Sequence, residues 1–337
     1  MKAVIRADGG PEIGYGHLVR TGAVAELLVE NGHRVTYATA TPDCVTEVCP
    51  SGIETLELPS RTDVSPLLER LEDVNVVLVD SYLADCDYQR ALRKIAPTAV
   101  VTDDTRHPVH ADLVANGNLY APDLEYEVCG EEPMWCFGPA YLLLRQEIAR
   151  RAKREPPRRE QPERALVTMG GSDTAELTPT VLRAFDGVDL TVDAVVGPGF
   201  SAAQERAIRE VAADVSARVR VVRDPEDLAE RMFCADLAVS TASTTTYELL
   251  ALGTPIVSIP VVDNQLPIAA ALRERDAAIV LERDAGESAI RRAIDRYLMC
   301  ASLRAERRRC GRELVDGRGA RRVYTELLSL VDGDSKP

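Results

Sequence analysis

A histidine follows two closely spaced glycines near the start of the chain, in the segment Gly14-Tyr15-Gly16-His17. The mainly apolar segment 1–7 before it predicts a buried strand, and the apolar periodicity after it predicts a helix. A glycine-rich turn between a strand and a helix presents backbone N–H groups where the helix dipole favours an anion. We therefore predict that His17 is a general base beside an anionic substrate. The alternative is a structural histidine beside an ordinary turn.

The same turn argues against a nicotinamide-type cofactor. Gly14 and Gly16 are not followed by a third glycine three residues later, so the spacing differs from the dinucleotide-binding fingerprint G-x-G-x-x-G. We expect no cofactor.

A second group of residues suited to anion binding lies in the other half of the chain. Five of the six residues from 241 to 246 carry hydroxyl groups, and an apolar helical pattern follows them. Hydroxyls and free amides at a helix N-terminus can bind phosphate, whereas simple N-capping needs only one such residue. Glu248, one turn further on, is placed to accept hydrogen bonds from a ribose. The predicted phosphate-binding residues are Ser243, Thr244 and Thr245, with the turn Gly170-Gly171.

Strand and helix patterns alternate along the chain, which is typical of an α/β protein with parallel sheets. Apolar runs of strand length lie at residues 74–80, 98–102, 165–169, 190–196 and 237–240. A charged stretch with adjacent prolines, 151–163, predicts a linker. We expect two Rossmann-like, doubly wound domains that face each other across a cleft. Residues 1–150 would carry the catalytic base, and residues 164–337 would bind a nucleotide, with a last helix that could pack back on the first domain.

Composition limits the partners and the setting. A net charge of −14 argues against nucleic acid or an anionic membrane as the main partner. No apolar run approaches the roughly 18 residues of a membrane-spanning helix, and the absence of a signal peptide predicts a cytoplasmic protein. Only four of the 40 basic residues are lysines, which leads to the hypothesis of a salt-rich cytoplasm, with a GC-rich genome as the alternative explanation. The oligomeric state stays open.

The cysteines and a histidine-containing loop do not predict a metal site. The eight cysteines include no C-x₂-C pair, and we expect scattered free thiols. The loop 103–112 holds acidic residues and two histidines, but no ligand spacing supports a metal there, and a solvated loop is the simpler interpretation. We expect no metal.

Several segments together resemble the nucleotide-sugar hydrolase family of pseudaminic acid biosynthesis, whose full substrate name is UDP-2,4-diacetamido-2,4,6-trideoxy-beta-L-altropyranose. That family is related to enzymes of the glycosyltransferase B fold. The resemblance covers nearly the whole chain, and its matching segments are Ile5–Asp8, Ile13–His17 with Arg20, Asp80–Tyr82, Asp103-Asp104, Gly138–Tyr141 with Leu144-Arg145, Met169–Asp173, and Glu248–Gly253 with Asn264-Gln265.

The resemblance implies roles for individual residues. The position of His17 activates the attacking water, Tyr82 lies by the sugar, and Glu248 and Asn264 belong to the nucleotide pocket with the hydroxyl-rich turn. Two departures from the family pattern, Gly9-Gly10-Pro11 and Thr21, touch the sugar side of the first turn and leave the sugar open. The full set of expected substrate-binding residues is Asp8, Gly14, Tyr15, Gly16, Arg20, Tyr82, Gly170, Gly171, Ser243, Thr244, Thr245, Glu248, Asn264 and Gln265.

Three functional hypotheses follow. The first is hydrolysis of a UDP-linked amino or deoxy sugar at its anomeric carbon, releasing UDP and free sugar, in the synthesis of a surface glycan that contains a nonulosonic-acid-like sugar. The second is a glycosyltransferase that moves the sugar from UDP to a lipid or small-molecule acceptor. The third is a nucleotide-sugar-binding protein without catalysis, which would leave His17 unexplained.

Overall fold

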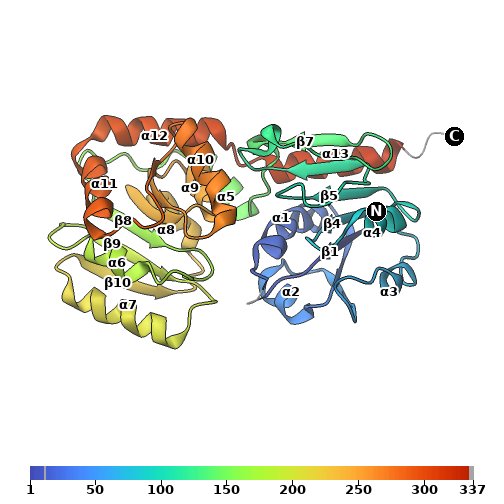
Figure 1. The fold of residues 1–337 in the computed structure, drawn as a ribbon, viewed down its shortest axis with the longest axis horizontal. Coiled ribbons are helices and arrows are strands. Elements are labelled where there is room, and N and C mark those ends of the chain that lie inside the picture. The colour runs from blue at the N-terminus through green and yellow to red at the C-terminus, as the bar shows by residue number, and fades with distance from the viewer. Residues whose placement is uncertain (11–12, 334–337) are drawn as a thin grey trace. The chain divides into compact units, whose positions relative to one another are not determined.

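The computed structural model describes residues 1–10 and 13–333, so Pro11 of the glycine-rich departure lies outside the described residues. The chain divides into two compact units, and each is described here by itself (Figure 1). Unit 1 comprises Met1–Gln146 and Gly317–Pro337, and unit 2 comprises Glu147–Asp316. The division thus falls a few residues before the expected linker, and the C-terminal segment belongs with the first half of the chain.

Unit 1 contains a parallel sheet of seven strands in the order β3-β2-β1-β4-β5-β6-β7. All five residues of β4 are buried, as expected of a strand with helices on both faces. The strands are β1 (Lys2–Ala7), β2 (Arg34–Thr39), β3 (Glu54–Glu57), β4 (Val76–Asp80), β5 (Thr98–Val101), β6 (Leu113–Asn116) and β7 (Met134–Phe137).

Helices cover both faces of this sheet. One apolar core lies under α1 and α13, and a second lies under α3 and α4. The oxygen of Asp85 accepts a hydrogen bond from the Tyr88 amide at 2.9 Å and so begins α4. The helical segments of unit 1 are α1 (Gly16–Glu30), α2 (Pro42–Val48), α3 (Ser65–Leu68), α4 (Cys86–Arg93), η1 (Ala121–Asp123), η2 (Pro139–Tyr141) and α13 (Gly319–Gly333). Helix α5 (Gln146–Arg151) begins at the last residue before the division and continues into unit 2.

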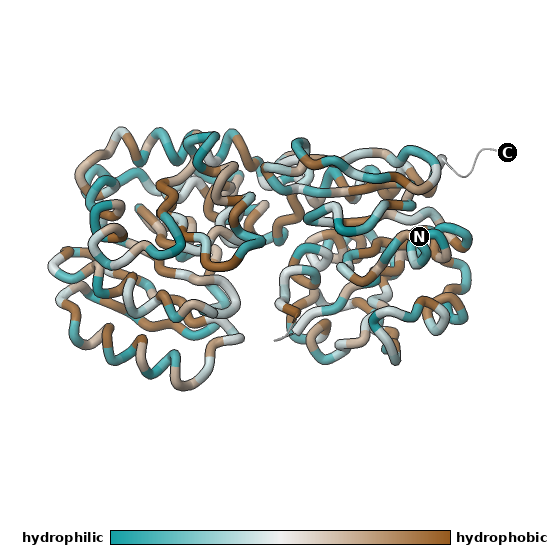
Figure 2. Tube along the Cα trace, viewed as in Figure 1, coloured by the Kyte–Doolittle hydropathy of each residue, from teal (hydrophilic) through white to brown (hydrophobic). Residues whose placement is uncertain are grey.

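Unit 2 repeats this architecture with a six-stranded parallel sheet in the order β10-β9-β8-β11-β12-β13. Its core gathers aliphatic side chains and Phe185 from the strands and from α6, α7 and α11. Hydrophilic and hydrophobic residues alternate along α7, which has one face on this core (Figure 2). The strands are β8 (Arg164–Thr168), β9 (Thr191–Val196), β10 (Arg218–Arg223), β11 (Leu237–Thr241), β12 (Ile256–Ile259) and β13 (Ile279–Val280). The helices are α6 (Thr178–Arg183), α7 (Ala202–Asp214), α8 (Leu228–Cys234), α9 (Thr244–Leu252), η3 (Asp263–Gln265), α10 (Leu266–Glu274), α11 (Glu287–Met299) and α12 (Ala301–Leu314).

Each sheet has one point where the strand order reverses. In unit 1 this point lies between β1 and β4, and in unit 2 it lies between β8 and β11. Open α/β sheets bind ligands outside the carboxyl ends of the strands at such a point. The predicted His17 turn follows β1, and the predicted hydroxyl-rich turn follows β11, so each lies at a reversal point.

Two further findings concern cysteines and membranes. Cys86 and Cys129 form a disulfide in the structure, so the expectation of scattered free thiols is wrong for this pair. Spacing could not reveal it, because the two residues are 43 positions apart and meet through loops of unit 1. Across residues 1–10 and 13–333, no helix combines the length and apolar character needed to span a bilayer.

Candidate functional site

The glycine-rich turn after β1 closes on itself before α1 begins. The Gly14 amide donates to the Gly10 carbonyl at 2.7 Å, and the Gly10 amide donates to the Gly14 carbonyl at 3.2 Å. Gly14 has φ +84°, a conformation that favours glycine, whereas Gly16 has an ordinary backbone and is the first residue of α1. Tyr15 is the N-cap residue. His17 is therefore held in the first turn of the helix, at the carboxyl end of β1.

A buried carboxylate fixes the His17 ring. Asp80, the last residue of β4, is 1% exposed, and its Oδ1 lies 2.7 Å from His17 Nδ1. Burial alone would raise the pKa of Asp80, but the charge of Arg20 and the hydrogen bonds from Arg20 and His17 hold it below its ordinary value. An ionised carboxylate can only accept, so the His17 Nδ1 carries the hydrogen. The Nε2 atom then keeps its lone pair for a proton.

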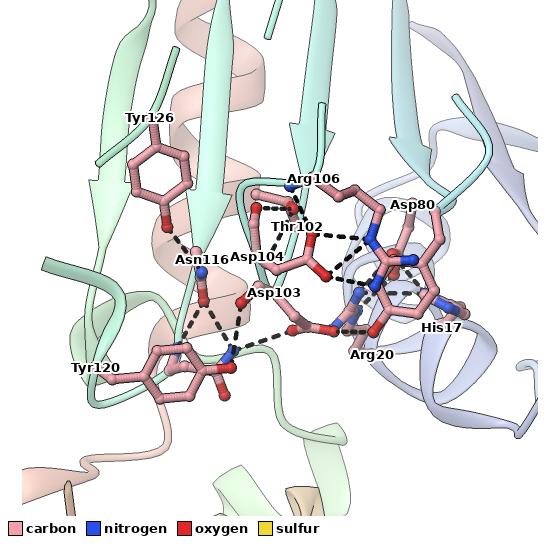
Figure 3. A network of polar contacts seen from close by, with 12 residues as sticks. His17, Arg20, Asp80, Thr102, Asp103, Asp104, Arg106, Asn116, Tyr120 and Tyr126 are labelled. Atoms are coloured by element: carbon pink, nitrogen blue, oxygen red, sulfur yellow. Dashed lines mark hydrogen bonds and ion pairs between the residues drawn. The ribbon is translucent and has the colours of Figure 1, made fainter. Parts of the chain in front are cut away.

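Arg20 joins two carboxylates at the carboxyl ends of neighbouring strands (Figure 3). Its Nε and Nη2 donate to the two oxygens of Asp80, both at 2.6 Å, and its Nη1 donates to Asp103 Oδ1 at 2.5 Å. Burial opposes ionisation of Asp103, but the Arg20 charge lowers its pKa to about 2. Burial likewise opposes the charge of Arg20, but Asp103 and Asp80 hold its pKa well above the ordinary value. All three groups are therefore charged, and the guanidinium fixes both carboxylates in place.

Tyr82 lies between His17 and a second arginine. Its hydroxyl donates to Asp103 Oδ2 at 2.7 Å, and its ring meets the His17 imidazole edge-on with centroids 4.6 Å apart. The Arg106 guanidinium lies 4.0 Å from the centroid of the Tyr82 ring. Burial and the neighbouring Asp103 raise the pKa of Tyr82 well above its usual range. The hydroxyl is thus a hydrogen-bond donor and not a base near neutral pH.

Asp8 has a different place from the rest of the predicted unit 1 residues. Its Oδ1 accepts hydrogen bonds from Thr39 Oγ1 at 3.0 Å and from the Ala40 amide at 2.7 Å, and its Oδ2 pairs with Arg6 at 2.7 Å. These contacts tie the ends of β1 and β2 together. Among the described residues, the hydrogen bonds and ion pairs of Asp8 support the backbone and not the His17 ring.

In unit 2, the Gly170-Gly171 turn lies next to the hydroxyl-rich turn, as the predicted phosphate site requires. Gly170 follows β8 with φ +81°, and a Cβ there would lie 3.8 Å from Thr245 Oγ1 and 3.9 Å from Ser243 Oγ. Gly171 is exposed beside it, and its carbonyl accepts a hydrogen bond from the Gly199 amide at 2.9 Å. The two turns therefore present backbone and hydroxyl groups together at the carboxyl edge of β8 and β11.

Part of the hydroxyl-rich turn stabilises the N-terminus of α9, as the N-capping alternative predicts. Thr246 Oγ1 is buried and donates to the Thr241 carbonyl at 2.8 Å, while the Ser243 amide contacts the same hydroxyl at 3.4 Å. Thr244 is exposed and Thr245 half-buried at the start of α9. Thr244 and Thr245 are thus the hydroxyl residues that N-capping does not require, and they are the ones placed to bind a phosphate.

The other predicted nucleotide residues differ in exposure. Glu248 is 5% exposed within α9. Asn264 is exposed in η3, and Gln265 Oε1 accepts a hydrogen bond from the Val261 amide at 2.8 Å, which closes the turn after β12. Since β12 pairs with β11 in parallel, Asn264 and the hydroxyl-rich turn lie at the same edge of the sheet.

Several residues in the unit 1 network were not among the predicted site residues. The loop 103–112, interpreted from sequence as solvated, contributes Asp103 to the centre of the network instead. Asn118 Nδ2 donates to Asp103 Oδ1 at 3.0 Å, and Tyr120 Oη donates to the Asp103 carbonyl at 3.1 Å. A signal was present, because Asp80 ends β4, Asp103 follows β5 and Asn118 follows β6, all at one edge of a parallel sheet.

Fold and site together define a class of protein: two doubly wound α/β units, each with polar groups at its reversal point, form the glycosyltransferase B fold. MurG of Acinetobacter baumannii is similar over 98% of this chain and 100% of its own, with a TM-score of 0.69 at 18% identity. CalG4, the calicheamicin glycosyltransferase, is similar over 100% of both chains, with a TM-score of 0.70 at 18% identity.

Sequence relatives are distant, and no family model matches the chain. The spore coat polysaccharide biosynthesis protein SpsG of Bacillus subtilis is 26% identical over 98% of this chain and 99% of its own length. The UDP-2,4-diacetamido-2,4,6-trideoxy-beta-L-altropyranose hydrolase of Campylobacter jejuni is 24% identical over 79% of this chain and 93% of its own. The uncharacterized protein MJ1062 of Methanocaldococcus jannaschii is 26% identical over 76% of this chain, and the match spans 55% of that protein's length.

Proposed function

We propose that the protein hydrolyses a UDP-linked amino or deoxy sugar at the anomeric carbon, releasing UDP and free sugar. The observation that carries the proposal is the His17–Asp80 pair, with 2.7 Å between Nδ1 and Oδ1, at the reversal point of the first sheet. The similarity to the Campylobacter jejuni hydrolase supports this reaction over others that use the fold.

In this mechanism His17 acts as the general base. Its Nδ1–H donates to Asp80, so Nε2 accepts a proton from water as the water oxygen attacks C1 of the sugar. The bond from C1 to the UDP oxygen breaks, and its electron pair leaves with UDP. Asp80 stabilises the imidazolium that forms, and the Arg20 bridge keeps Asp80 ionised and correctly placed.

Unit 2 would bind the nucleotide. The Gly170-Gly171 backbone and the N-terminus of α9 at Thr244 and Thr245 offer donors to the diphosphate, which gains negative charge as the bond to C1 breaks. Removing one such donor costs about 3 kcal/mol in other enzymes. The proposal assigns the ribose to Glu248 and the base and neighbouring groups to Asn264 and Gln265.

The first test is release of UDP and free sugar from a panel of UDP-sugars, followed by mass spectrometry with and without EDTA. We expect turnover of at least one amino or deoxy sugar that EDTA does not abolish. His17→Asn should lose about 10²–10⁴-fold in rate. His33→Gln is the matched control, since His33 contacts the chain's first amino group at the opposite edge of the sheet. No UDP release from any sugar would contradict the proposal.

Glycosyl transfer is the second candidate, because CalG4 shares the fold and is named a glycosyltransferase. A transferase would release UDP slowly in water and rapidly once a lipid or small-molecule acceptor is added. A steep acceptor dependence in the same assay would replace hydrolysis by transfer. A sugar nucleotide that binds and stays intact for hours would instead favour the non-catalytic binding protein.

The proposal includes the setting of the reaction. The Bacillus subtilis relative is named for polysaccharide biosynthesis, and we propose a comparable part in making a surface glycan that contains a nonulosonic-acid-like sugar. In this scheme the protein acts in the cytoplasm, where the UDP-sugar substrate is found. The acidic, lysine-poor composition supports the further proposal that this cytoplasm is rich in salt.

A further inference from the structure

Three potential metal ligands meet in unit 1 at a place that the proposed reaction does not use. Cys86 is the first residue of α4, His110 lies between β5 and β6, and Cys129 lies between η1 and β7. One ligand atom from each residue lies within 4.8 Å of the other two, and all three residues are half-buried. The two sulfurs are joined in the structure, which leaves the role of the nearby imidazole unexplained by the disulfide alone.

Backbone contacts hold this arrangement without the sulfur–sulfur bond. The segments of His110 and Cys129 run in parallel through a bridge between Val109 and Val128. The Cys129 amide donates to the Val109 carbonyl at 2.9 Å, and the Val109 amide donates to the Glu127 carbonyl at 2.8 Å. The three ligands would therefore stay close after reduction.

Gln89 connects these segments to α4. Its Oε1 accepts a hydrogen bond from the His110 amide at 2.8 Å, and its Nε2 donates to the Ala84 carbonyl at 2.8 Å. Gln89 is buried, so these bonds are shielded from water. The start of α4, which carries Cys86, is thus fixed relative to His110.

Neighbouring groups orient the three side chains in a way that suits metal binding. His110 Nδ1 contacts the Cys129 carbonyl oxygen, which fixes the hydrogen on Nδ1 and leaves the Nε2 lone pair available to a metal. Arg90 Nη2 lies 3.2 Å from Cys86 Sγ, so after reduction its positive charge would be next to this metal ligand. The Cα atoms of the two cysteines are 6.9 Å apart, just beyond the range of about 4.4–6.8 Å usual for disulfides.

We propose that Cys86, His110 and Cys129 form a Zn²⁺ site when the two cysteines are reduced. Reduction by a dithiol or phosphine delivers two electrons and two protons to the sulfurs, and Zn²⁺ then displaces those protons from the thiols. Two thiolates and a neutral imidazole bind the ion, with water as the fourth ligand of a tetrahedral site. The two thiolates balance the charge of the metal, and the disulfide is the metal-free, oxidised state of the same residues.

The proposed site adjoins the loops that carry the His17 network. Tyr82 lies four positions before Cys86, the first residue of α4, and its carbonyl lies 3.0 Å from Nε2 of His107 in the loop of His110. The metal would hold these loops together without contacting the reacting atoms. The inference does not depend on the hydrolase proposal.

Cobalt binding to the full-length chain tests the inference. The protein is reduced with a phosphine under argon, freed of reductant and titrated with Co²⁺ and then with Zn²⁺. We expect one Co²⁺ per chain, an intense near-ultraviolet thiolate-to-cobalt band, and loss of that band as Zn²⁺ displaces the cobalt. Protein left in the disulfide form should show no band.

Variants identify the ligands. Cys86→Ser and Cys129→Ser should each lower Co²⁺ affinity by more than the roughly 10–100-fold that loss of an outer partner costs, and His110→Asn should weaken it as well. Cys300→Ser, a free half-buried cysteine in unit 2, is the matched control and should bind as the parent does. The inference is overturned if the reduced parent shows no band, or if the band persists in both triad cysteine variants. If circular dichroism shows that those variants are unfolded, the comparison of the cobalt band in the reduced and oxidised parent protein still tests the inference.

Discussion

Replacing Asp80 with asparagine tests whether activity needs the His17–Asp80 hydrogen bond or only the presence of His17. The carboxylate receives three charge-assisted or imidazole hydrogen bonds, two from Arg20 at 2.6 Å and one from His17 at 2.7 Å, and it is 1% exposed. Asparagine offers one acceptor oxygen and one NH₂ group, so it cannot accept all three hydrogen bonds, and its NH₂ group opposes a donor of Arg20 or of His17. The NH₂ group can also donate to Nδ1 and select the tautomer that places the hydrogen on Nε2.

Two magnitudes follow from this geometry. In a serine protease, the corresponding change from aspartate to asparagine leaves the fold intact and lowers kcat about 10⁴-fold through the wrong histidine tautomer. We therefore expect Asp80→Asn to lower kcat by about 10³–10⁴-fold. Breaking a buried ion pair typically costs about 3–5 kcal/mol, and the retained Arg20–Asp103 pair places the expected loss of stability at the lower end.

The assay measures kcat, KM and the urea midpoint of each variant, together with the ¹⁵N shifts of the His17 ring, which report the tautomer. Asp104→Asn is the matched control, because Asp104 pairs with Arg106 and not with His17. A folded Asp80→Asn protein with turnover within threefold of the parent would refute the reasoning. So would a lost activity with the hydrogen still on Nδ1, since orientation of His17 would then not be the cause.

The remaining predictions concern Tyr82, the nucleotide residues and acid stability. Tyr82→Phe removes the hydrogen bond to Asp103 and should raise KM about fivefold with a smaller effect on kcat, measured by UDP release. Glu248→Ala and Asn264→Ala should weaken UDP binding by about 1–3 kcal/mol in calorimetry, whereas His17→Asn should leave it nearly unchanged; equal losses in all three would contradict the division of labour. The folded pKa of Asp103 is about 2, below the unfolded value of about 3.9, so its stabilisation of about 3 kcal/mol is present above pH 4 and is lost as the pH falls toward 2. The difference in urea stability between the parent and Asp103→Asn should therefore narrow below pH 4, and a constant difference would argue against an ionised Asp103.

The sequence predicted the two parallel sheets because most of their central strands are apolar runs, which can be recognised without knowing which strands pair. The run 74–80 became β4 at Val76–Asp80, and the patterns after it alternated as expected of a doubly wound fold. The position of His17 followed from the same reasoning, since a turn after the first strand lies at a carboxyl edge.

The side-chain network could not be read from the sequence to the same extent. Asp103 sits in a loop rich in turn-forming residues, and only the three-dimensional approach of Arg20 distinguishes it from a solvated carboxylate. Asp8 looked equally suited to a ligand, yet it ties β1 to β2 through Thr39 and Ala40. The Cys86–Cys129 pair depends on the path of the chain through β5 and β6, which no local spacing encodes.

The most direct test of the central claim is the fate of the water oxygen. The enzyme, with the UDP-sugar that it turns over fastest, is allowed to react in H₂¹⁸O, and both products are analysed at once by mass spectrometry. Attack on the anomeric carbon with His17 as the base predicts one ¹⁸O in the sugar released and none in UDP, with His17→Asn forming neither product at a comparable rate. Label in the UDP phosphate, or unimpaired labelling of the sugar by His17→Asn, would contradict the account.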